Sequence, residues 1–181
     1  MKKKNLLTIV FLVVTTCFYG QKYITKTGSV KFEATVPSFE EVAADNKTTS
    51  AVLEASTGDI AILALMKGFR FKVALMEEHF NENYVESTKY PKATFKGKVD
   101  GLDVSKLTAE AKTFTITGDL TLHGKTKKVT DQAKISKNGN TITVVGAFEV
   151  KPEEFDIAIP AVVSKKVSDK ISVSYNLALV K

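Results

Sequence analysis

The segment "TFTITGDLTLH", residues 113–123, alternates apolar and polar side chains without interruption. Successive side chains of a β-strand point to opposite faces of a sheet. One face of this segment therefore carries Phe114, Ile116, Gly118, Leu120 and Leu122. The other face carries threonines, one aspartate and one histidine. The segment predicts a strand with one buried face and one face in water.

The same alternation recurs over most of the chain and predicts eight or nine strands. We expect them at residues 22–36, 50–57, 59–66, 68–76, 92–100, 113–123, 127–136, 140–150 and 170–180. The connections carry turn signals: "HGKTKK" begins at His123, "TGD" occupies residues 57–59, and Asn138 with Gly139 predicts an Asn-Gly hairpin turn. Short turns of this kind join neighbouring strands antiparallel.

An antiparallel sheet of this size would expose two edges unless it closed on itself. Closure removes both edges, and consecutive hairpins close most simply into an up-and-down barrel. The sequence therefore predicts an all-β fold: an antiparallel up-and-down β-barrel of about eight strands with one or two short helices. The helices are expected within residues 39–45 and 76–87.

The inward faces of the predicted strands mix large and small residues. Gly97, Gly118, Gly146 and Ala93 alternate there with phenylalanines, of which the chain has eleven, and there is no tryptophan. A barrel of about eight strands is either filled by its own side chains or has room for one small ligand. We expect the small residues to leave gaps between the bulky ones, and hence a cavity.

The stretch "LMEEHFNENYVES", residues 75–87, interrupts the strand pattern. Its apolar residues recur at close to helical spacing and form an aromatic stripe above an acidic and amide face. Pro91 then keeps Tyr90 out of the helical region, and the chain returns to a strand. The stretch predicts a short helix that caps the barrel.

The first twenty residues, "MKKKNLLTIVFLVVTTCFYG", are arranged as a secretory signal peptide, with three lysines, an apolar run from Leu6 to Val14 and a polar exit. The run is shorter than the roughly 20 residues that a spanning helix needs. We expect cleavage after Gly20, a mature domain over residues 21–181 with no integral membrane span, and a periplasmic or secreted location. The alternative is a lipoprotein anchored through Cys17, the single cysteine.

Charge and cysteine content exclude several classes of function. The formal net charge of +6 falls to +3 when residues 1–20 leave, because they contain three lysines and no acidic residue. Arg70 is the single arginine, whereas base and phosphate recognition depends on bidentate guanidinium groups. We therefore expect no nucleic-acid partner. Without a cysteine, the mature chain forms no disulfide and performs no thiol catalysis.

The two histidines are weak candidates for chemistry. His79 lies beside Glu78 and Glu82, but a metal site needs three or four convergent ligands. His123 follows a strand end and precedes Gly124, which suits a turn residue that bonds a neighbouring loop. General acid or base work needs a partner that the sequence does not place. We expect no metal, no cofactor and no catalytic residue.

Four stretches together resemble the YceI-like family of exported lipid-binding or polyisoprenoid-binding proteins: "LMEEHFNENYVESTKYPKATFKG" (75–97), "GDLTLHGKTKKV" (118–129), "FDIAIP" (155–160) and "VSDKISVSYNLAL" (167–179). The resemblance covers nearly the whole mature chain. It implies an extended, lipocalin-like antiparallel barrel whose long apolar interior holds an isoprenoid chain. Residues 32–60 depart from the family pattern, so the resemblance implies no head-group contacts.

The resemblance and the alternation together imply an apolar lining that binds the lipid. The predicted lipid-binding residues are Phe69, Phe71, Leu75, Met76, Phe80, Tyr84, Phe95, Phe114, Leu120, Leu122, Phe148, Phe155, Ile157, Ile159 and Tyr175. Each methylene-sized unit of such a ligand gains roughly 0.8 kcal/mol when it leaves water. Polar contacts at the mouth are expected from Lys67, Arg70, Asn81, Asn83 and Tyr84.

The sequence leaves other functions open. An outer-membrane barrel would also combine a signal peptide with alternating strands, but the faces opposite the apolar ones carry Thr, Lys, Asp and Glu, the reverse of a lipid-facing exterior. A barrel enzyme acting on an apolar substrate would use His79 or His123. A protein that binds another protein, and a homodimer, are further alternatives. The prediction is a non-enzymatic carrier of one isoprenoid, isoprenoid quinone or other lipid.

Overall fold

A computed structural model describes residues 21–37 and 39–181; the predicted signal peptide and Cys17 lie outside these residues. The described chain contains nine strands. They are β1 (Lys22–Thr35), β2 (Ala43–Glu54), β3 (Asp59–Leu65), β4 (Arg70–Phe71), β5 (Lys92–Val99), β6 (Lys112–Leu122), β7 (Lys125–Asn138), β8 (Thr141–Val150) and β9 (Val167–Val180). One α-helix, α1 (Ala74–His79), leads into the π-helical turn η2 (Phe80–Tyr84). Three 3₁₀ turns complete the set: η1 (Met66–Gly68), η3 (Val104–Lys106) and η4 (Pro152–Phe155).

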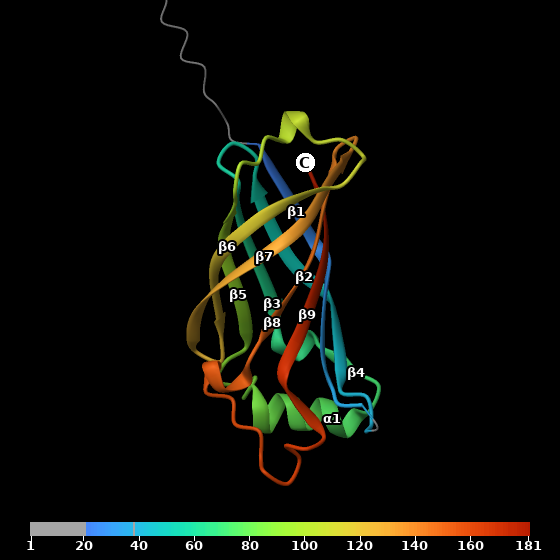
Figure 1. Cartoon of the computed structure of the whole chain (residues 1–181), viewed down its shortest axis with the longest axis vertical. Coiled ribbons are helices and arrows are strands. Elements are labelled where there is room, and N and C mark those ends of the chain that lie inside the picture. Colours follow the sequence, from blue (N-terminus) through green and yellow to red (C-terminus); the bar gives the residue numbers. More distant parts are fainter. Residues whose placement is uncertain (1–20, 38) are drawn as a thin grey trace, which may run out of the picture.

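The sheet closes into a barrel (Figure 1). Eight strands pair antiparallel in chain order, and β9 returns to β1, which also pairs with β2. The two-residue strand β4 adds to the outer end of β2. The predicted up-and-down barrel of about eight strands with a short helix is therefore confirmed.

The interior has two unlike halves. In the first, which we call the packed half, buried apolar side chains form one cluster, in which Leu53, Ile135, Ile142, Val144 and Leu177 are fully buried. The turn η3 lies across this end of the barrel, at the top of Figure 1. At the opposite end α1 crosses below the strands. The half of the interior nearer α1, the hollow half, is lined by a second apolar cluster that includes Phe69, Val85, Phe155 and Ile157.

The interior glycines do not leave the gaps that the sequence predicted. A Cβ atom on Gly97 or Gly118 would lie 2.7 or 2.6 Å from the ring of Phe95, which lies across both glycines. Each would also meet a strand carbonyl within 2.6 Å. These glycines therefore make room for an aromatic ring in the wall, and the space they free is occupied.

The hairpin turns form close to where they were expected. His123 and Gly124 join β6 to β7 with positive φ at both residues, and Gly58 has φ 76° in the predicted turn before β3. The Asn-Gly turn is displaced: Asn138 is still paired in β7, and the two-residue loop is formed by Gly139 and Asn140. Gly139 has φ 56°, and this position of the turn therefore favours a residue without a side chain.

The predicted helix within residues 39–45 is wrong, because residues from Ala43 onward belong to β2. Their strand propensity is low, but they pair with β1, where Ala44 opposes Phe32. Asn46 is fully buried and donates from Nδ2 to the Leu65 carbonyl at 2.9 Å, while its Oδ1 accepts from the Thr48 N–H at 2.9 Å. Tertiary pairing and a satisfied buried amide override local preference here.

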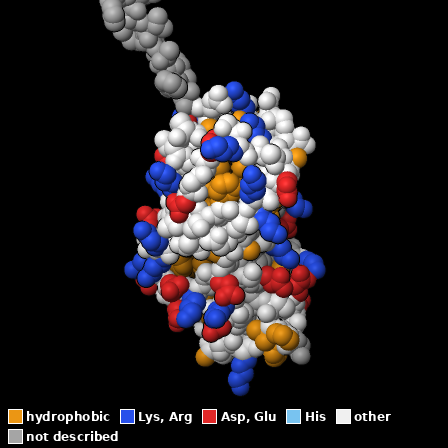
Figure 2. All heavy atoms as spheres, turned by 45° about the horizontal axis from the view of Figure 1, so that its top comes forward, with side chains coloured by type: hydrophobic (Ala, Val, Ile, Leu, Met, Phe, Trp, Pro, Cys, Tyr) orange, Lys and Arg blue, Asp and Glu red, His pale blue; other side chains and the backbone are white. Residues whose placement is uncertain are grey.

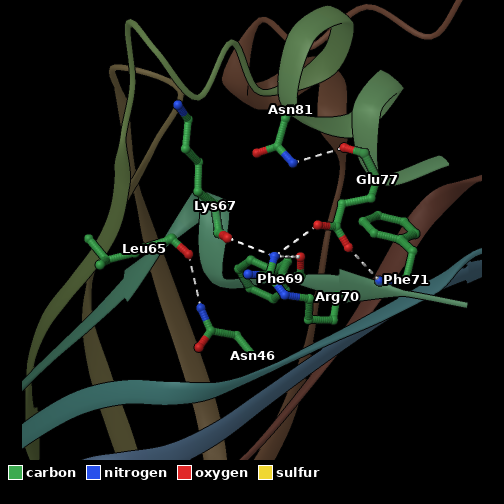
Figure 3. A network of polar contacts seen from close by, with 8 residues as sticks. All are labelled: Asn46, Leu65, Lys67, Phe69, Arg70, Phe71, Glu77 and Asn81. Carbon is green, nitrogen blue, oxygen red and sulfur yellow. Dashed lines mark hydrogen bonds and ion pairs between the residues drawn. The ribbon is translucent and has the colours of Figure 1, made fainter. Parts of the chain in front are cut away.

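The predicted strand over residues 68–76 is also wrong, because only Arg70 and Phe71 form a strand there, β4, and α1 begins at Ala74. Glu77 bends this segment back on itself (Figure 3). Its Oε1 accepts from Arg70 Nη1 at 2.8 Å and its Oε2 from the Phe71 N–H at 3.2 Å. Arg70 Nη1 also donates to the Lys67 carbonyl at 2.9 Å. One carboxylate thus ties the start of the helix to the strand before it.

The outer face of the barrel is polar. Figure 2 shows basic and acidic side chains interspersed over the strands with few large apolar groups between them. This matches the alternation in the sequence, which turns Thr, Lys, Asp and Glu outward. Among residues 21–37 and 39–181, no helix has the length and apolar character needed to cross a membrane.

Candidate functional site

The hollow half contains a cavity of about 410 Å³. Binding pockets for small ligands typically have volumes of roughly 300–1,000 Å³. Every barrel strand except β2 supplies its walls, and the turn η2, Met76 and His79 of α1 and the loop between β8 and β9 line its outer end. Nearly all of these side chains are apolar, so the cavity suits a hydrocarbon and offers few groups for chemistry.

Four phenylalanines form the aromatic centre of the outer end. Phe32, from β1, lies 5.4 Å from Phe69, 5.7 Å from Phe71 and 5.3 Å from Phe80 between ring centroids. Phe80 also contacts Phe69 and Phe71, at 5.8 and 5.2 Å. Aromatic pairs at these separations stabilise each other beyond the area they bury. The cluster joins the barrel wall to η2, which carries Phe80.

Thirteen of the fifteen predicted lipid-binding residues line this cavity. They are Phe69, Phe71, Met76, Phe80, Tyr84, Phe95, Leu120, Leu122, Phe148, Phe155, Ile157, Ile159 and Tyr175. Leu75 does not: it is 57% exposed, because on a helix it points about 100° away from its neighbour Met76. Phe114 does not either, since it pairs with Ala133 farther along β6 and packs against the packed half.

Several lining residues were absent from the predicted set. They are Val30, Phe32, Ala34, Ile62, Ile171 and Val173. The signal that identifies them is the strand alternation itself, which puts each on the inward face of β1, β3 or β9. Some inward positions face the cavity and others face the packed half. The difference depends on where side chains fill the interior, and the alternation of a strand does not predict this.

Most of the residues expected to make polar contacts at the mouth do not line the cavity. Of Lys67, Arg70, Asn81, Asn83 and Tyr84, only Tyr84 lines the cavity. As Figure 3 shows, Arg70 is held by Glu77 and by backbone carbonyls, and Asn81 Nδ2 donates to the Glu77 carbonyl at 2.8 Å. The exposed polar residues that do line the outer end are Glu40, His79 and Lys166.

His123 is a structural residue at the hollow end. Its Nδ1 lies 2.9 Å from the Phe155 carbonyl and its Nε2 2.8 Å from Glu86 Oε2. The ring of Tyr90 stands edge-on to it at 4.5 Å. His123 thus ties the β6–β7 turn to η4 and to the chain that follows η2, as the sequence suggested. Within the described part of the chain, histidine, cysteine and carboxylate side chains do not gather in a group of three that could hold a metal ion.

The inner end of the cavity is polar. Tyr175, which is 7% exposed, donates from its hydroxyl to Asp131 Oδ2 at 2.6 Å, and both residues line the cavity. Burial, reinforced by the bond to the Asp131 carboxylate, raises the pKa of the Tyr175 hydroxyl far above its ordinary value, so it stays protonated. Asp131 was missed in the sequence, although it stands on the inward face of β7 with Val129, Ala133 and Ile135.

Comparison with solved structures gives the same fold at low sequence identity. A polyisoprenoid binding domain from Saccharophagus degradans superposes with a TM-score of 0.78 at 14% identity, covering 89% of this chain and 98% of its own. BcnA from Burkholderia cenocepacia gives 0.69 at 18% identity, with 84% and 96% covered. The Campylobacter jejuni YceI protein gives 0.64 at 17% identity, with 81% and 88% covered.

No curated protein matches the chain significantly. The sequence profile of the YceI-like domain, however, matches residues 21–179, which is nearly all of the described barrel. The match spans the strands, α1 and the loop between β8 and β9, and so includes every element that lines the cavity. This protein belongs to the YceI-like family.

Proposed function

We propose that this protein is an exported carrier that holds one amphiphilic lipid, an isoprenoid chain or isoprenoid quinone, in the hollow half of its barrel. The observation that carries the proposal is the cavity of about 410 Å³ with an almost entirely apolar lining. Family membership supports it, as does the fold shared with a polyisoprenoid binding domain. One chain supplies all of the residues that line this cavity.

The energetics favour a long hydrocarbon. Each methylene-sized unit that leaves water contributes roughly 0.8 kcal/mol. Association costs about 4–15 kcal/mol in lost freedom. A chain of about a dozen units therefore offsets an intermediate cost before any polar contact is counted. Short apolar molecules fall below that threshold, which is why we assign a chain rather than a small ring compound.

We further propose that the protein binds without turnover. Both ring nitrogens of His123 contact acceptors, and its side chain is only 10% exposed, so neither nitrogen is free to move a proton to or from a guest. His79 lines the cavity but stands exposed at its outer end. The predicted signal peptide supports export to the periplasm or secretion, and cell fractionation tests that part directly.

Gentle purification followed by native mass spectrometry tests the carrier function. We expect the purified protein to carry a lipid, or to take up a polyprenol or an isoprenoid quinone when offered one. Phe80→Ala, in the cavity lining, should weaken uptake by about tenfold, the effect of losing a buried aromatic contact. Leu75→Ala is the matched control, because Leu75 lies on α1 outside the cavity lining. This variant should change lipid uptake by no more than about twofold. Protein that stays free of lipid under all these conditions refutes the proposal.

A further inference from the structure

Asp131 and Tyr175 lie where the two halves of the interior meet. Tyr175 packs with the buried residues of the packed half and also lines the cavity. In β9 it opposes Val30 of β1, and in β6 Ile116 opposes Asp131 of β7. Val30 and Ile116 both line the cavity as well. The pair therefore stands at the inner end of the cavity, the end that borders the packed half.

The bond between these residues spans a strand. Asp131 is in β7 and Tyr175 in β9, and β8 runs between them. Gly146 of β8 pairs with Tyr175, and a Cβ atom on Gly146 would lie 2.3 Å from the Tyr175 hydroxyl and 2.1 Å from Asp131 Oδ2. The absence of a side chain at position 146 lets the phenol pass under β8 and reach the carboxylate.

The carboxylate keeps unused capacity to accept hydrogen bonds. An ionised carboxylate offers about four acceptor positions. In the part of the chain that the structure describes, the Tyr175 hydroxyl is the one side-chain partner that Asp131 has. A charge facing an apolar space is unfavourable unless it is paired or solvated. The inner end of the cavity is thus a place where a donor group is stabilised and a bare hydrocarbon end is not.

We propose that Asp131 and Tyr175 form a polar subsite that selects amphiphiles whose inserted end carries a hydrogen-bond donor, a hydroxyl or an ammonium group. This inference rests on the proposed carrier function and names the class of guest more narrowly. An anionic group cannot enter first, because the Asp131 carboxylate repels it. Guests with a phosphate or carboxylate at one end therefore bind with that end at the mouth, where Lys166 lies.

The test compares chains that differ only at the inserted end. Lipid-free full-length protein is titrated with palmitic, ω-hydroxypalmitic and ω-aminopalmitic acids, and with the corresponding stearic series, so that one length reaches the subsite. In each, the carboxylate is held at the mouth. We expect the hydroxyl-ended and ammonium-ended chains of the matching length to bind about fivefold more tightly than the methyl-ended one, the effect of one net hydrogen bond.

Two variants separate the roles of charge and shape. Asp131→Asn keeps the size and an acceptor but removes the charge, so it should retain the preference for the hydroxyl end and lose the preference for the ammonium end. Asp131→Leu should reverse both and favour the methyl end. Asp119→Asn, an exposed carboxylate on β6, is the matched control and should change neither.

Wild-type protein that binds methyl-ended and hydroxyl-ended chains equally at every length overturns the inference and leaves the carrier function standing. The same holds if Asp131→Asn keeps the full preference for the ammonium end. Failure of every chain and of polyprenol to bind overturns the carrier function itself, and the inference with it. The comparison within wild-type protein decides the question even if a variant does not fold.

Discussion

His123 Nε2 lies 2.8 Å from Oε2 of Glu86, and this contact links the turn between β6 and β7 to the segment that follows the helical cap. Both residues have positive φ, 50° and 44°, as does Asp156, with 54°, next to Phe155, whose carbonyl bonds the other nitrogen of the ring. Non-glycine residues rarely adopt this conformation. One imidazole therefore joins three connections, each of which contains a non-glycine residue in this uncommon conformation.

Replacing His123 by Phe should loosen that arrangement. The ring still packs on Tyr90, but both hydrogen bonds are lost, one of them to a carboxylate. We expect the free energy of unfolding to fall by about 1–3 kcal/mol. Hydrogen exchange should accelerate in residues 85–91 and 151–166 and remain unchanged in β2 and β8. Lys127→Ala, exposed on the same hairpin, serves as the control. Unchanged exchange in both segments would contradict the assignment.

Adding a methyl group at position 146 should break the bond between Asp131 and Tyr175. Gly146→Ala places a carbon 2.5 Å from the Tyr175 ring carbon that bears the hydroxyl, so the ring has to move. Overpacking of this kind costs about 1–3 kcal/mol, measurable by urea unfolding. Ala147→Ser, on the outward face of the same strand, should stay within about 0.5 kcal/mol. A stable Gly146→Ala protein with an unshifted Tyr175 would show that the strand gives way instead.

The contact between Arg70 and Glu77 should affect local order more than global stability. The Arg70 side chain is 65% exposed and that of Glu77 28%, and ion pairs so accessible to water contribute about 0–1 kcal/mol. A double-mutant cycle of Arg70→Met and Glu77→Gln is expected to give a coupling within that range. Amide exchange at Phe71, whose N–H loses a charged acceptor, should nevertheless rise clearly. A coupling of several kcal/mol would mean that the segment is buried more deeply than it is here.

Acid should destabilise the end of the barrel that η3 covers, because it protonates Asp103. Its carboxylate accepts from the Ser105 hydroxyl at 2.6 Å and the Ser105 N–H at 3.0 Å, and lies 3.0 Å from Lys106 Nζ. The Ser105 hydroxyl first, then Lys106, lower the pKa of Asp103 from 3.8 to about 2. Folding therefore favours the ionised form. The stabilisation is complete above the ordinary pKa and disappears as the pH falls towards 2.

Melting curves recorded between about pH 6 and pH 2 test this dependence on Asp103. Asp103→Asn should melt below wild-type protein at the upper end, and the difference between the two should shrink as the acid limit is approached. Ser105→Ala should shift in the same direction by a smaller amount. If the difference in melting temperature between the two proteins stayed constant over the whole pH range, Asp103 would not be the source of the pH dependence.

The strands with uninterrupted alternation were predictable because their pattern reflects the burial that stabilises them. β6 begins and ends one residue earlier than predicted, and β8 begins one residue later than predicted. The start of β2 was not predictable in this way, since Ala43–Asn46 form a strand only because β1 offers them a partner. The path of the segment before α1 was not predictable for a similar reason: Glu77, which follows that segment, holds Arg70 and Phe71 in place.

For the site, the sequence predicts which side chains point into the barrel. It does not predict which parts of the interior those side chains fill. Alternation gives the side of the sheet on which Phe95 lies, but not that its ring lies over Gly97 and Gly118 and occupies the predicted gap. Likewise, Asp131 could have been noticed as a carboxylate on an apolar face. Its significance depends on Tyr175 reaching it from two strands away, and such a contact requires three-dimensional information.

The residues around Leu53, Ile142 and Leu177 bury their side chains against one another, outside the cavity lining. The chain can therefore reach its native shape while empty, and loading follows folding as a separate event. Substitutions around the hollow half then affect mainly which ligand the cavity accepts, and affect the folding of the barrel less. The residues that line the cavity of such a barrel can change during evolution, and with them the ligand, while the packed half still stabilises the fold.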